Sequence, residues 1–521
     1  MRQESSPLAT YSDERHGLSA KGLSAGSIGL LGATVIGISC VAPAYTLTAS
    51  LGPIVAKVGP QTPAIILIGF LPMLLVAFGY RELNRAMPDS GTSFTWATRA
   101  FGPRIGWLAG WGLVASTILV LSNTAGIAVD FFYLMLSQIF RNPHLTELSA
   151  NPFINVATCL AFMGVATIIS YRGMEVTKAF QYVLVGFQVV VLTLFAVEAF
   201  VKIHAGAAFD PLPVRLDWFN PLAAPTFSAV AAGLSLSIFI FWGWDVTLTM
   251  NEETKGSRST PGRAATATVV TTMLLYVFAS TASIAFAGLG TGRFGLGNPE
   301  IQRNAFLALA APIMGTSAIL ISICVLASSA ASLQSTIVSP SRTLLAMGHY
   351  GALPDALTRI DPKYRTPSNA IFTSTFVSSL FYAVMRFLSA HVLWDTITAL
   401  GIMICFYYSL TAFASVWYFR RQWFVSPANL FNQLICPLLG GIALAALFCT
   451  TIVDSMDPAF GSGSQVHGIG LVFILGMGII LIGVVIMTAM AIWKPAFFRG
   501  EKLSTSVSDG REDHGLDHLP V

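Results

Sequence analysis

The sequence predicts an all-α polytopic membrane protein with twelve transmembrane helices. Of its 521 residues, 54% are hydrophobic and only 10% are charged, whereas a soluble domain carries about a quarter charged residues. The mean hydropathy of +0.69 agrees with this class. A helical span needs about 20 mostly apolar residues. Twelve stretches meet this requirement, near 27–54, 63–83, 103–137, 153–171, 176–200, 224–253, 264–288, 314–345, 367–388, 392–419, 428–453 and 467–493.

The first and the sixth stretch are interrupted at corresponding places. Residues 37–43 (Gly-Ile-Ser-Cys-Val-Ala-Pro) interrupt the first, and Trp242-Gly243-Trp244-Asp245 interrupts the sixth. Because lipid offers no hydrogen-bond partner, non-helical backbone at this depth must be buried in protein or line a cavity. Interrupted helices at corresponding positions of two halves are typical of transporters whose substrate site lies near the middle of the membrane.

The distribution of Lys and Arg predicts the topology. With both tails cytoplasmic, 22 of the 29 basic residues lie inside and seven outside, which satisfies the positive-inside rule. Spans 1–5 and 6–10 each begin with an interrupted helix, and because five is odd the two sets insert with opposite orientation. The expected units are a cytoplasmic N-terminal tail (1–26), a first inverted repeat (27–200), a second inverted repeat (224–420), spans 11 and 12 (428–494) and a cytoplasmic C-terminal tail (495–521).

Two regions outside the repeats carry further expectations. Spans 11 and 12 are expected to serve packing or the formation of a homo-oligomer. The tail after Lys494 is polar and aperiodic, so we expect it to be disordered.

The composition excludes several function classes. The net charge of +4 follows from positive-inside sorting and requires no nucleic acid partner. The six cysteines lie within apolar stretches and show no paired spacing, so neither a disulfide framework nor a zinc site is indicated. We find no nucleophile with a base and no pair of metal ligands on a span, and therefore expect neither an enzyme nor a bound metal or cofactor. The absence of any N-x-S/T sequon favours a bacterial inner membrane.

Several short motifs follow one another along the chain. Between spans 2 and 3 they are Glu82-Leu83, Pro88-Asp89-Ser90-Gly91-Thr92-Ser93-Phe94-Thr95-Trp96, Phe101-Gly102-Pro103 and Gly110-Trp111. Span 6 contributes Gly243-Trp244-Asp245 and Glu252-Glu253-Thr254-Lys255. After span 8 come Ser341-Arg342, Ala346-Met347, Gly351-Ala352-Leu353-Pro354, Pro362-Lys363 and Thr366-Pro367. In this order they resemble the permeases of the amino acid-polyamine-organocation (APC) superfamily, which have a LeuT-like fold with a 5+5 inverted repeat.

The resemblance implies a secondary active transporter that moves amino acids or related amines by alternating access, either coupled to an ion or by exchange. Its partners would be a small-molecule amino acid or amine and the lipid bilayer. An amino-acid-sensing membrane receptor that binds without transporting is the alternative. Short tails without a signalling domain give that alternative little support.

The two interruptions can supply both poles that an amino acid needs. Amides at the positive end of a half-helix suit a carboxylate, and carbonyl ends in span 6 suit an ammonium. The resemblance implies the carboxylate on amides around residues 38–40 and the ammonium on carbonyls of residues 239–242. The expected substrate-binding residues are Gly37, Ile38, Ser39, Cys40, Val41, Phe239, Phe241, Trp242, Gly243 and Asp245. The alternative for Gly37 and Pro43 is that they only pack and kink the helix.

Asp245 and a few polar residues are candidates for coupling to a proton or a sodium ion. A carboxylate near the middle of the membrane costs about 2.5–3.5 kcal/mol or more, so Asp245 is expected to contact the ammonium, carry a proton or cap the second half-helix. Gln188 stands where the resemblance implies a lysine in some proton-driven relatives. The remaining candidates are hydroxyls on one face of span 8, whose alternative role is to join helices: Ser328, Ser332, Ser335 and Thr336.

Three residues are gate candidates. Phe239 precedes Gly243 by four residues, where the resemblance implies an aromatic side chain over the substrate. Glu252 and Glu253 lie at the cytoplasmic end of span 6, and we expect them to form an inner gate with Arg or Lys partners such as Arg99 or Arg342.

Overall fold

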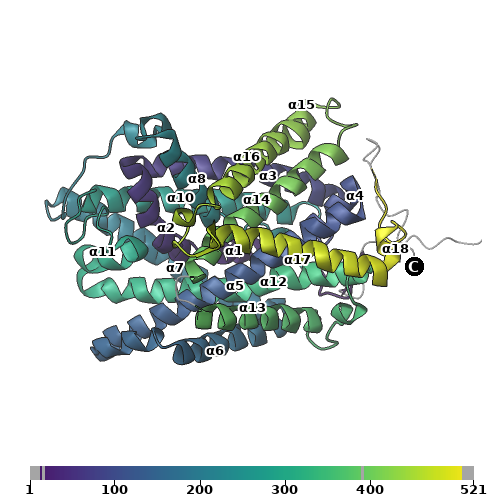
Figure 1. Cartoon of the computed structure of the whole chain (residues 1–521), viewed down its shortest axis with the longest axis horizontal. Coiled ribbons are helices and arrows are strands. Elements are labelled where there is room, and N and C mark those ends of the chain that lie inside the picture. The colour runs from purple at the N-terminus through teal and green to yellow at the C-terminus, as the bar shows by residue number, and fades with distance from the viewer. Residues whose placement is uncertain (1–11, 14–17, 389–391, 507–521) are drawn as a thin grey trace, which may run out of the picture.

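Long helices run side by side through the computed structural model (Figure 1), which describes residues 12–13, 18–388 and 392–506. The first group comprises α1 (Leu30–Val41), α2 (Pro43–Val58), α3 (Thr62–Ala86), α4 (Ser93–Phe101), α5 (Pro103–Phe140), α6 (Pro152–Tyr171) and α7 (Met174–His204). The second comprises α8 (Phe227–Ile240), α9 (Val246–Thr249), α10 (Thr260–Ala287), α11 (Ala305–Met314), α12 (Ile319–His349), α13 (Ser368–Leu388) and α14 (Val392–Tyr418). It is followed by α15 (Pro427–Asn429), α16 (Cys436–Asp454), α17 (Leu471–Trp493) and α18 (Pro495–Phe498).

Strands contribute little to the described part of the chain. Two antiparallel pairs of two-residue strands are present: β1 (Ser12–Asp13) with β2 (Leu18–Ser19), and β3 (Gln465–Val466) with β4 (Ile469–Gly470). A six-residue π-helical turn, Leu430–Ile435, joins α15 to α16. The fold is therefore all-α in its core, as predicted.

Within the described residues, ten helical stretches are long and apolar enough to cross a membrane. The first of them, Leu30–Ala86, contains α1, α2 and α3 together. Helix α8 has only 14 residues and falls short of a full span by itself. The prediction of a polytopic membrane protein is confirmed.

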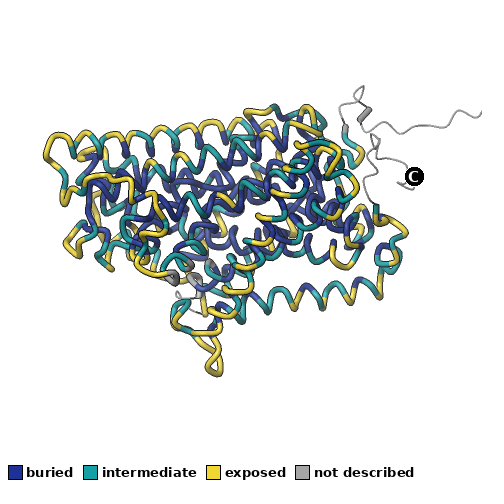
Figure 2. Tube along the Cα trace, turned by 90° about the horizontal axis from the view of Figure 1, so that it is seen from above, coloured by how far each residue is buried: buried dark blue, intermediate teal, exposed yellow. Residues whose placement is uncertain are grey.

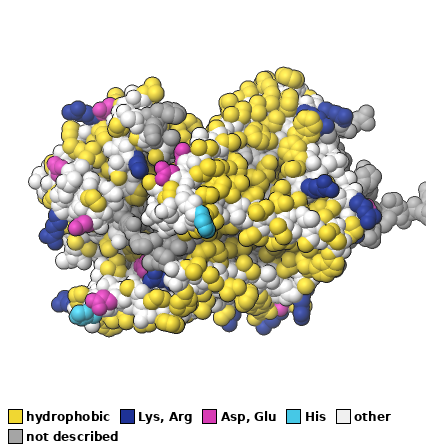
Figure 3. All heavy atoms as spheres, in the orientation of Figure 1, with side chains coloured by type: hydrophobic (Ala, Val, Ile, Leu, Met, Phe, Trp, Pro, Cys, Tyr) yellow, Lys and Arg dark blue, Asp and Glu magenta, His cyan; other side chains and the backbone are white. Residues whose placement is uncertain are grey.

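The interior and the surface differ as a membrane environment requires. Buried residues fill the central helices, whereas exposed residues lie on the outer helices (Figure 2). Many exposed side chains are nevertheless apolar, among them Leu481 and Val485 of α17. Hydrophobic side chains cover much of the face in Figure 3, and several Lys and Arg side chains lie toward its two ends.

The C-terminal tail departs from the prediction where it is described. Helix α18 and the residues after it fold back onto α4 and the end of α12, and Phe497 and Leu503 are buried there. The ring of Phe497 stacks on Phe94 at 5.4 Å. The prediction of disorder after Lys494 is therefore wrong for residues 495–503, because two apolar side chains of this polar segment are buried against the bundle. The remaining predictions for the tails at 1–11, 14–17 and 507–521 lie outside the described residues.

Candidate functional site

The interruption of the first span is a single residue, Ala42. It has φ +55° and ψ +63° and joins α1 to α2. A proline disfavours helical backbone at the residue before it, so the break falls immediately before Pro43. Residues 37–41 remain helical. The expected break over residues 37–43 is therefore too long, and free amides at residues 38–40 are wrong, because those residues lie in the last turns of α1.

The helix N-terminus that follows the break is the start of α2. Pro43 has no N–H, and the backbone N–H of Tyr45 donates to Ser328 Oγ at 3.3 Å. The backbone N–H of Thr46 donates to the carbonyl of Ala42. This end of α2 is the positive pole of the interruption, and it has the orientation that suits a carboxylate.

Gly37 permits a close approach between helices. A Cβ at this position would lie 2.3 Å from Thr268 Oγ1 and 2.8 Å from Thr247 Cγ2. Gly37 therefore has a packing role, since any side chain would push α1 away from α9 and α10, and its role in substrate binding stays a prediction.

The interruption of the sixth span is longer and matches the prediction. Helix α8 ends at Ile240, residues 241–245 form turns, and α9 begins at Val246. Gly243 has φ +107°, a conformation that a side chain disfavours. A Cβ on Gly243 would lie 3.0 Å from both the carbonyl carbon and the Sγ of Cys40. The second interruption therefore packs directly on the last turn of α1, two residues before the break at Ala42.

Tyr276 of α10 connects the two interruptions through its hydroxyl. The hydroxyl donates to the carbonyl of Ile240, the last residue of α8, at 2.8 Å. It also lies 2.6 Å from Thr46 Oγ1 in α2. A carbonyl freed by the helix break is thus paired inside the protein, as the low-dielectric interior requires.

Asp245 is held by two consecutive tyrosines of α14. Tyr408 donates its hydroxyl to Oδ1 at 2.9 Å, and Tyr407 donates to Oδ2 at 3.1 Å. Trp242 Nε1 donates to the Tyr407 hydroxyl at 2.8 Å. The carboxylate makes no capping bond to α9, so the capping alternative is wrong. Sequence reasoning missed both tyrosines, although adjacent hydroxyl-bearing rings in an apolar stretch were a usable signal.

Aromatic rings surround this carboxylate. Trp244 stacks on Tyr408 at 5.3 Å, and the edge of Tyr80 meets Trp244 at 5.0 Å. Phe241 contacts Tyr276, with ring centres 5.3 Å apart. Phe239 is also buried in this cluster, and its role as a gate stays a prediction.

The four hydroxyls of span 8 join α12 to the interrupted first span. Ser332 Oγ donates to the carbonyl of Cys40 at 3.3 Å, and Thr336 Oγ1 lies 3.6 Å from Cys40 Sγ. Ser335 Oγ lies 3.0 Å from Ser39 Oγ. Together with Ser328, which accepts from α2, all four contact α1 or α2. This pattern fits the helix-joining alternative, and a role in ion coupling stays a prediction.

Gln188 is fully buried in α7, and neither side-chain polar atom has a hydrogen-bond partner among the described residues. A buried unpaired polar group costs about 1–3 kcal/mol. Its proposed role in coupling stays untested by this geometry.

Charged side chains close the end of the bundle where the described chain begins and ends. Lys21 Nζ lies 2.7 Å from Asp89 Oδ2 and 2.5 Å from Glu252 Oε1. Tyr350 donates its hydroxyl to Asp89 at 2.7 Å. Burial alone would raise the pKa of Asp89, but the Lys21 ammonium and the donated hydrogen bonds lower it to about 2. The carboxylate is therefore ionised throughout the physiological range.

A second ion pair lies at the same end of the bundle and is more deeply buried. Arg342 donates from Nε to Glu253 Oε2 at 2.9 Å and from Nη2 to Oε1 at 3.1 Å. Both side chains are buried, at 0% and 1% exposed. The Arg342 partner is confirmed, whereas Arg99 is wrong, because its guanidinium donates to the carbonyl of Ser504. Lys21 was missed, since it lies in a polar tail far from span 6. We call Lys21, Asp89, Glu252, Glu253 and Arg342 the ion-pair cluster.

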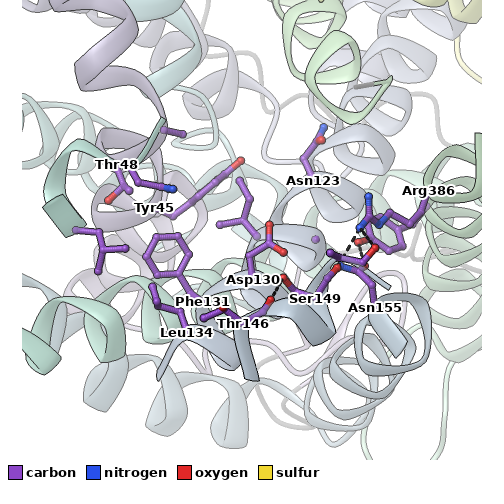
Figure 4. Close-up of a pocket in the computed structure, with 17 residues that line it drawn as sticks. Tyr45, Thr48, Asn123, Asp130, Phe131, Leu134, Thr146, Ser149, Asn155 and Arg386 are labelled. Carbon is purple, nitrogen blue, oxygen red and sulfur yellow. Dashed lines mark hydrogen bonds between the residues drawn. The ribbon is translucent and has the colours of Figure 1, made fainter. Parts of the chain in front are cut away.

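The opposite end of the bundle contains a cavity of about 510 Å³ (Figure 4). The cavity lies beside the C-terminal half of α5 and the C-terminal end of α13. The ion-pair cluster lies instead near the N-terminal end of α5 and the C-terminal end of α12. The lining of the cavity includes Tyr45, Asn123, Asp130, Asn155, Tyr382 and Arg386. Tyr45 is three residues beyond the Ala42 break, so the cavity reaches the first turn of α2.

A family model described as amino acid permease matches residues 28–479 of the chain. The chain belongs to the amino acid permease family. One similar protein is the branched-chain amino acid permease BcaP of Lactococcus lactis subsp. cremoris (strain MG1363). It is 22% identical over 438 residues, which cover 80% of this chain and 87% of that protein.

Membership in this family makes the protein an APC-type transporter integral to a membrane, and not an enzyme, as predicted. The permease places its interrupted spans, Asp245 and the aromatic rings in one cluster between α1, α8 and α14. No group of three His, Cys, Asp or Glu side chains that could hold a metal occurs in the described parts of the permease.

Cys40 offers a test of this location. Cys40 is 3% exposed, and its thiol lies beside Gly243 and Thr336. We therefore expect a thiol reagent to modify it slowly and a saturating substrate to slow the reaction further. Variants that keep only Cys40 or only Cys159 separate the two sites, because Cys159 is fully buried in another cluster. Identical Cys40 labelling with and without every transported substrate would remove this thiol from the site.

Proposed function

We propose that this permease is a secondary active transporter that carries amino acids by alternating access, with the substrate bound beside the two helix interruptions, at Ala42 and Gly243. The packing of the two helix interruptions, with a Gly243 Cβ position only 3.0 Å from Cys40, carries this proposal. One interruption presents the positive end of α2 and the other presents the Asp245 carboxylate. Together they offer a partner for each charged group of an amino acid.

We propose twelve spans arranged as a LeuT-like inverted repeat, with residues 27–200 and 224–420 as its two halves. The stretch Leu30–Ala86 would supply spans 1 and 2, and α8 with α9 would supply the interrupted span 6. Corresponding helices of the two halves pair in space, since α3 packs on α10 and α5 packs on α12. Residues 428–494 would add spans 11 and 12, whose exposed apolar side chains suit lipid or a second copy of the chain.

The proposed orientation puts both termini in the cytoplasm of a bacterial cell, according to the positive-inside rule. The ion-pair cluster then closes the cytoplasmic side, and the cavity at Tyr45 opens toward the exterior. This conformation would accept substrate from outside. Breaking the ion pairs and closing the cavity would complete the transport cycle.

The site favours an amino acid with an apolar side chain. Phe239, Phe241 and Val41 are buried around the interruptions, and apolar walls bind apolar groups through burial. The similarity to a branched-chain amino acid permease supports this choice. A proton or a sodium ion is proposed as the coupling ion, without a further cofactor.

Counterflow separates transport from the receptor alternative. Proteoliposomes loaded with unlabelled leucine, isoleucine or valine should accumulate the labelled amino acid transiently. Binding to the purified protein without counterflow for any amino acid would instead identify a receptor.

Asp245→Asn should raise the apparent KM for the substrate by about tenfold, which corresponds to about 1.4 kcal/mol. The reason is that an amide cannot attract an ammonium as a carboxylate does. Exchange and pH-driven accumulation should be measured together, because a proton-carrying carboxylate predicts retained exchange with lost accumulation. Tyr407→Phe is the matched control, since it removes one hydrogen bond and keeps the charge. Unchanged kinetics at every pH would remove Asp245 from substrate binding and from coupling.

A further inference from the structure

A second cavity, of about 650 Å³, opens at the end of the bundle that holds the ion-pair cluster. It lies between the end of α4, the end of α14 and the segment after α18. We call it the arginine groove. Its walls include Phe101, Trp417, Arg420, Arg421, Thr505 and Ser506, and no acidic side chain lines it in the described part of the chain.

The arginine groove has a cationic wall with a defined geometry. The guanidinium of Arg420 lies over the Trp417 ring, 4.2 Å from its centre. Nη1 of Arg420 also donates to the Trp417 carbonyl at 2.9 Å. These contacts hold the guanidinium plane of Arg420 in place, and Arg421, the next residue, also lines the groove. Guanidinium groups suit a phosphate, whose oxygens accept paired hydrogen bonds.

The facing wall is fixed to α4. Ser506 donates its backbone N–H to the carbonyl of Arg99 at 2.9 Å, and Arg99 Nη1 donates to the carbonyl of Ser504 at 3.2 Å. These two bonds hold the segment that places Thr505 in the groove. The groove therefore has hydroxyl-bearing residues opposite its arginines.

The arginine groove lies at the level of the membrane surface. A candidate membrane span ends at Tyr418, and the candidate span formed by α5 begins at Pro103. Trp417 is 47% exposed and Phe101 is 37% exposed. Aromatic side chains concentrate at the headgroup level of membranes, and basic pockets between spans on the cytoplasmic side suit anionic headgroups.

We propose that the arginine groove binds the phosphate of an anionic phospholipid, with the acyl chains passing over Phe101 and Trp417. The leaflet rests on the proposed topology, whereas the binding itself requires no transport activity. The competing occupant is the chain's own acidic segment beyond Ser506, which contains Asp509, Glu512, Asp513 and Asp517. Exposed aromatic rings at the span ends favour the lipid, because a polar peptide gains little from them.

Native mass spectrometry of the full-length protein tests the proposal with phosphatidylglycerol and phosphatidylcholine as probes. Phosphatidylglycerol should bind at least tenfold more tightly than phosphatidylcholine. The double variant Arg420→Gln/Arg421→Gln should lose that preference, and Arg420→Lys/Arg421→Lys should weaken it while keeping the charge. The matched control is Arg258→Gln/Arg263→Gln, which removes two exposed arginines away from the groove. A monodisperse size-exclusion peak confirms that each variant is folded.

If the groove variant and the control lose the preference for phosphatidylglycerol equally, the proposal is overturned, because the loss would be a general effect of charge. Displacement of phosphatidylglycerol by millimolar inorganic phosphate would also overturn it, since the groove would then hold a free anion. Neutralising the four acidic residues beyond Ser506 should leave lipid binding unchanged. Lipid binding that appears only after this neutralisation would identify the acidic segment as the occupant instead.

Discussion

Gly243→Leu should abolish amino acid uptake while the protein still reaches the membrane. Gly243 has φ +107°, and its Cβ position lies 3.0 Å from Cys40. A leucine would therefore strain the backbone and separate the two interruptions. Because left-handed backbone costs a side chain about 1–2 kcal/mol, even Gly243→Ala should reduce uptake by about tenfold. Uptake in whole cells, normalised to the amount of protein in the membrane, measures both effects.

Gly186→Leu provides the matched control for this experiment. Gly186 lies in α7, where no atom within 4 Å would meet a Cβ, and it is exposed on the helix surface. Uptake by the Gly186→Leu variant should match that of the parent protein. Normal uptake by Gly243→Leu would place the substrate away from span 6 and would refute the proposed site.

The contrast between the two interruptions shows what local sequence determines. Turns around Gly243 were predictable, because tryptophans, a glycine and an aspartate interrupt an apolar run. The position of the first break was not, because a glycine in an apolar helix can mark either a break or a close approach. Gly37 belongs to the second kind, since Thr268 occupies the space beside it. The proline rule alone would have given the correct residue, Ala42.

Contacts between segments far apart in the sequence were the features that could be predicted least well. Arg342 was predicted as one of the cationic partners for Glu252 and Glu253 at the cytoplasmic end of span 6. Lys21 gave no comparable signal, since a polar tail has many positions of the same kind. The adjacent Tyr407 and Tyr408 indicated a polar site in an apolar helix, but not the residue they would contact. Their partners, Glu252 and Asp245, are defined by how helices far apart in sequence pack together.

Arg342→Gln should destabilise the closed state of the bundle by about 3–5 kcal/mol, because it leaves the buried carboxylate of Glu253 without its cation. Both side chains are at most 1% exposed, and two hydrogen bonds join them. We expect a lower melting temperature and a loss of accumulation, with greater access to thiol reagents from the side of the ion-pair cluster. Thermal unfolding in detergent and labelling in proteoliposomes measure these changes.

The double variant Arg342→Gln/Glu253→Gln identifies the cause of the loss. It removes both charges and leaves two amides of similar size that can bond to each other, so stability should return in part even if transport does not. Arg359→Gln is the matched control, because this arginine is exposed in the loop before α13. If the single and double variants lose the same stability, burial of an unpaired charge is not the reason. The pair would then act through the shape of its side chains, and opening this side of the permease would not require an ion pair to break.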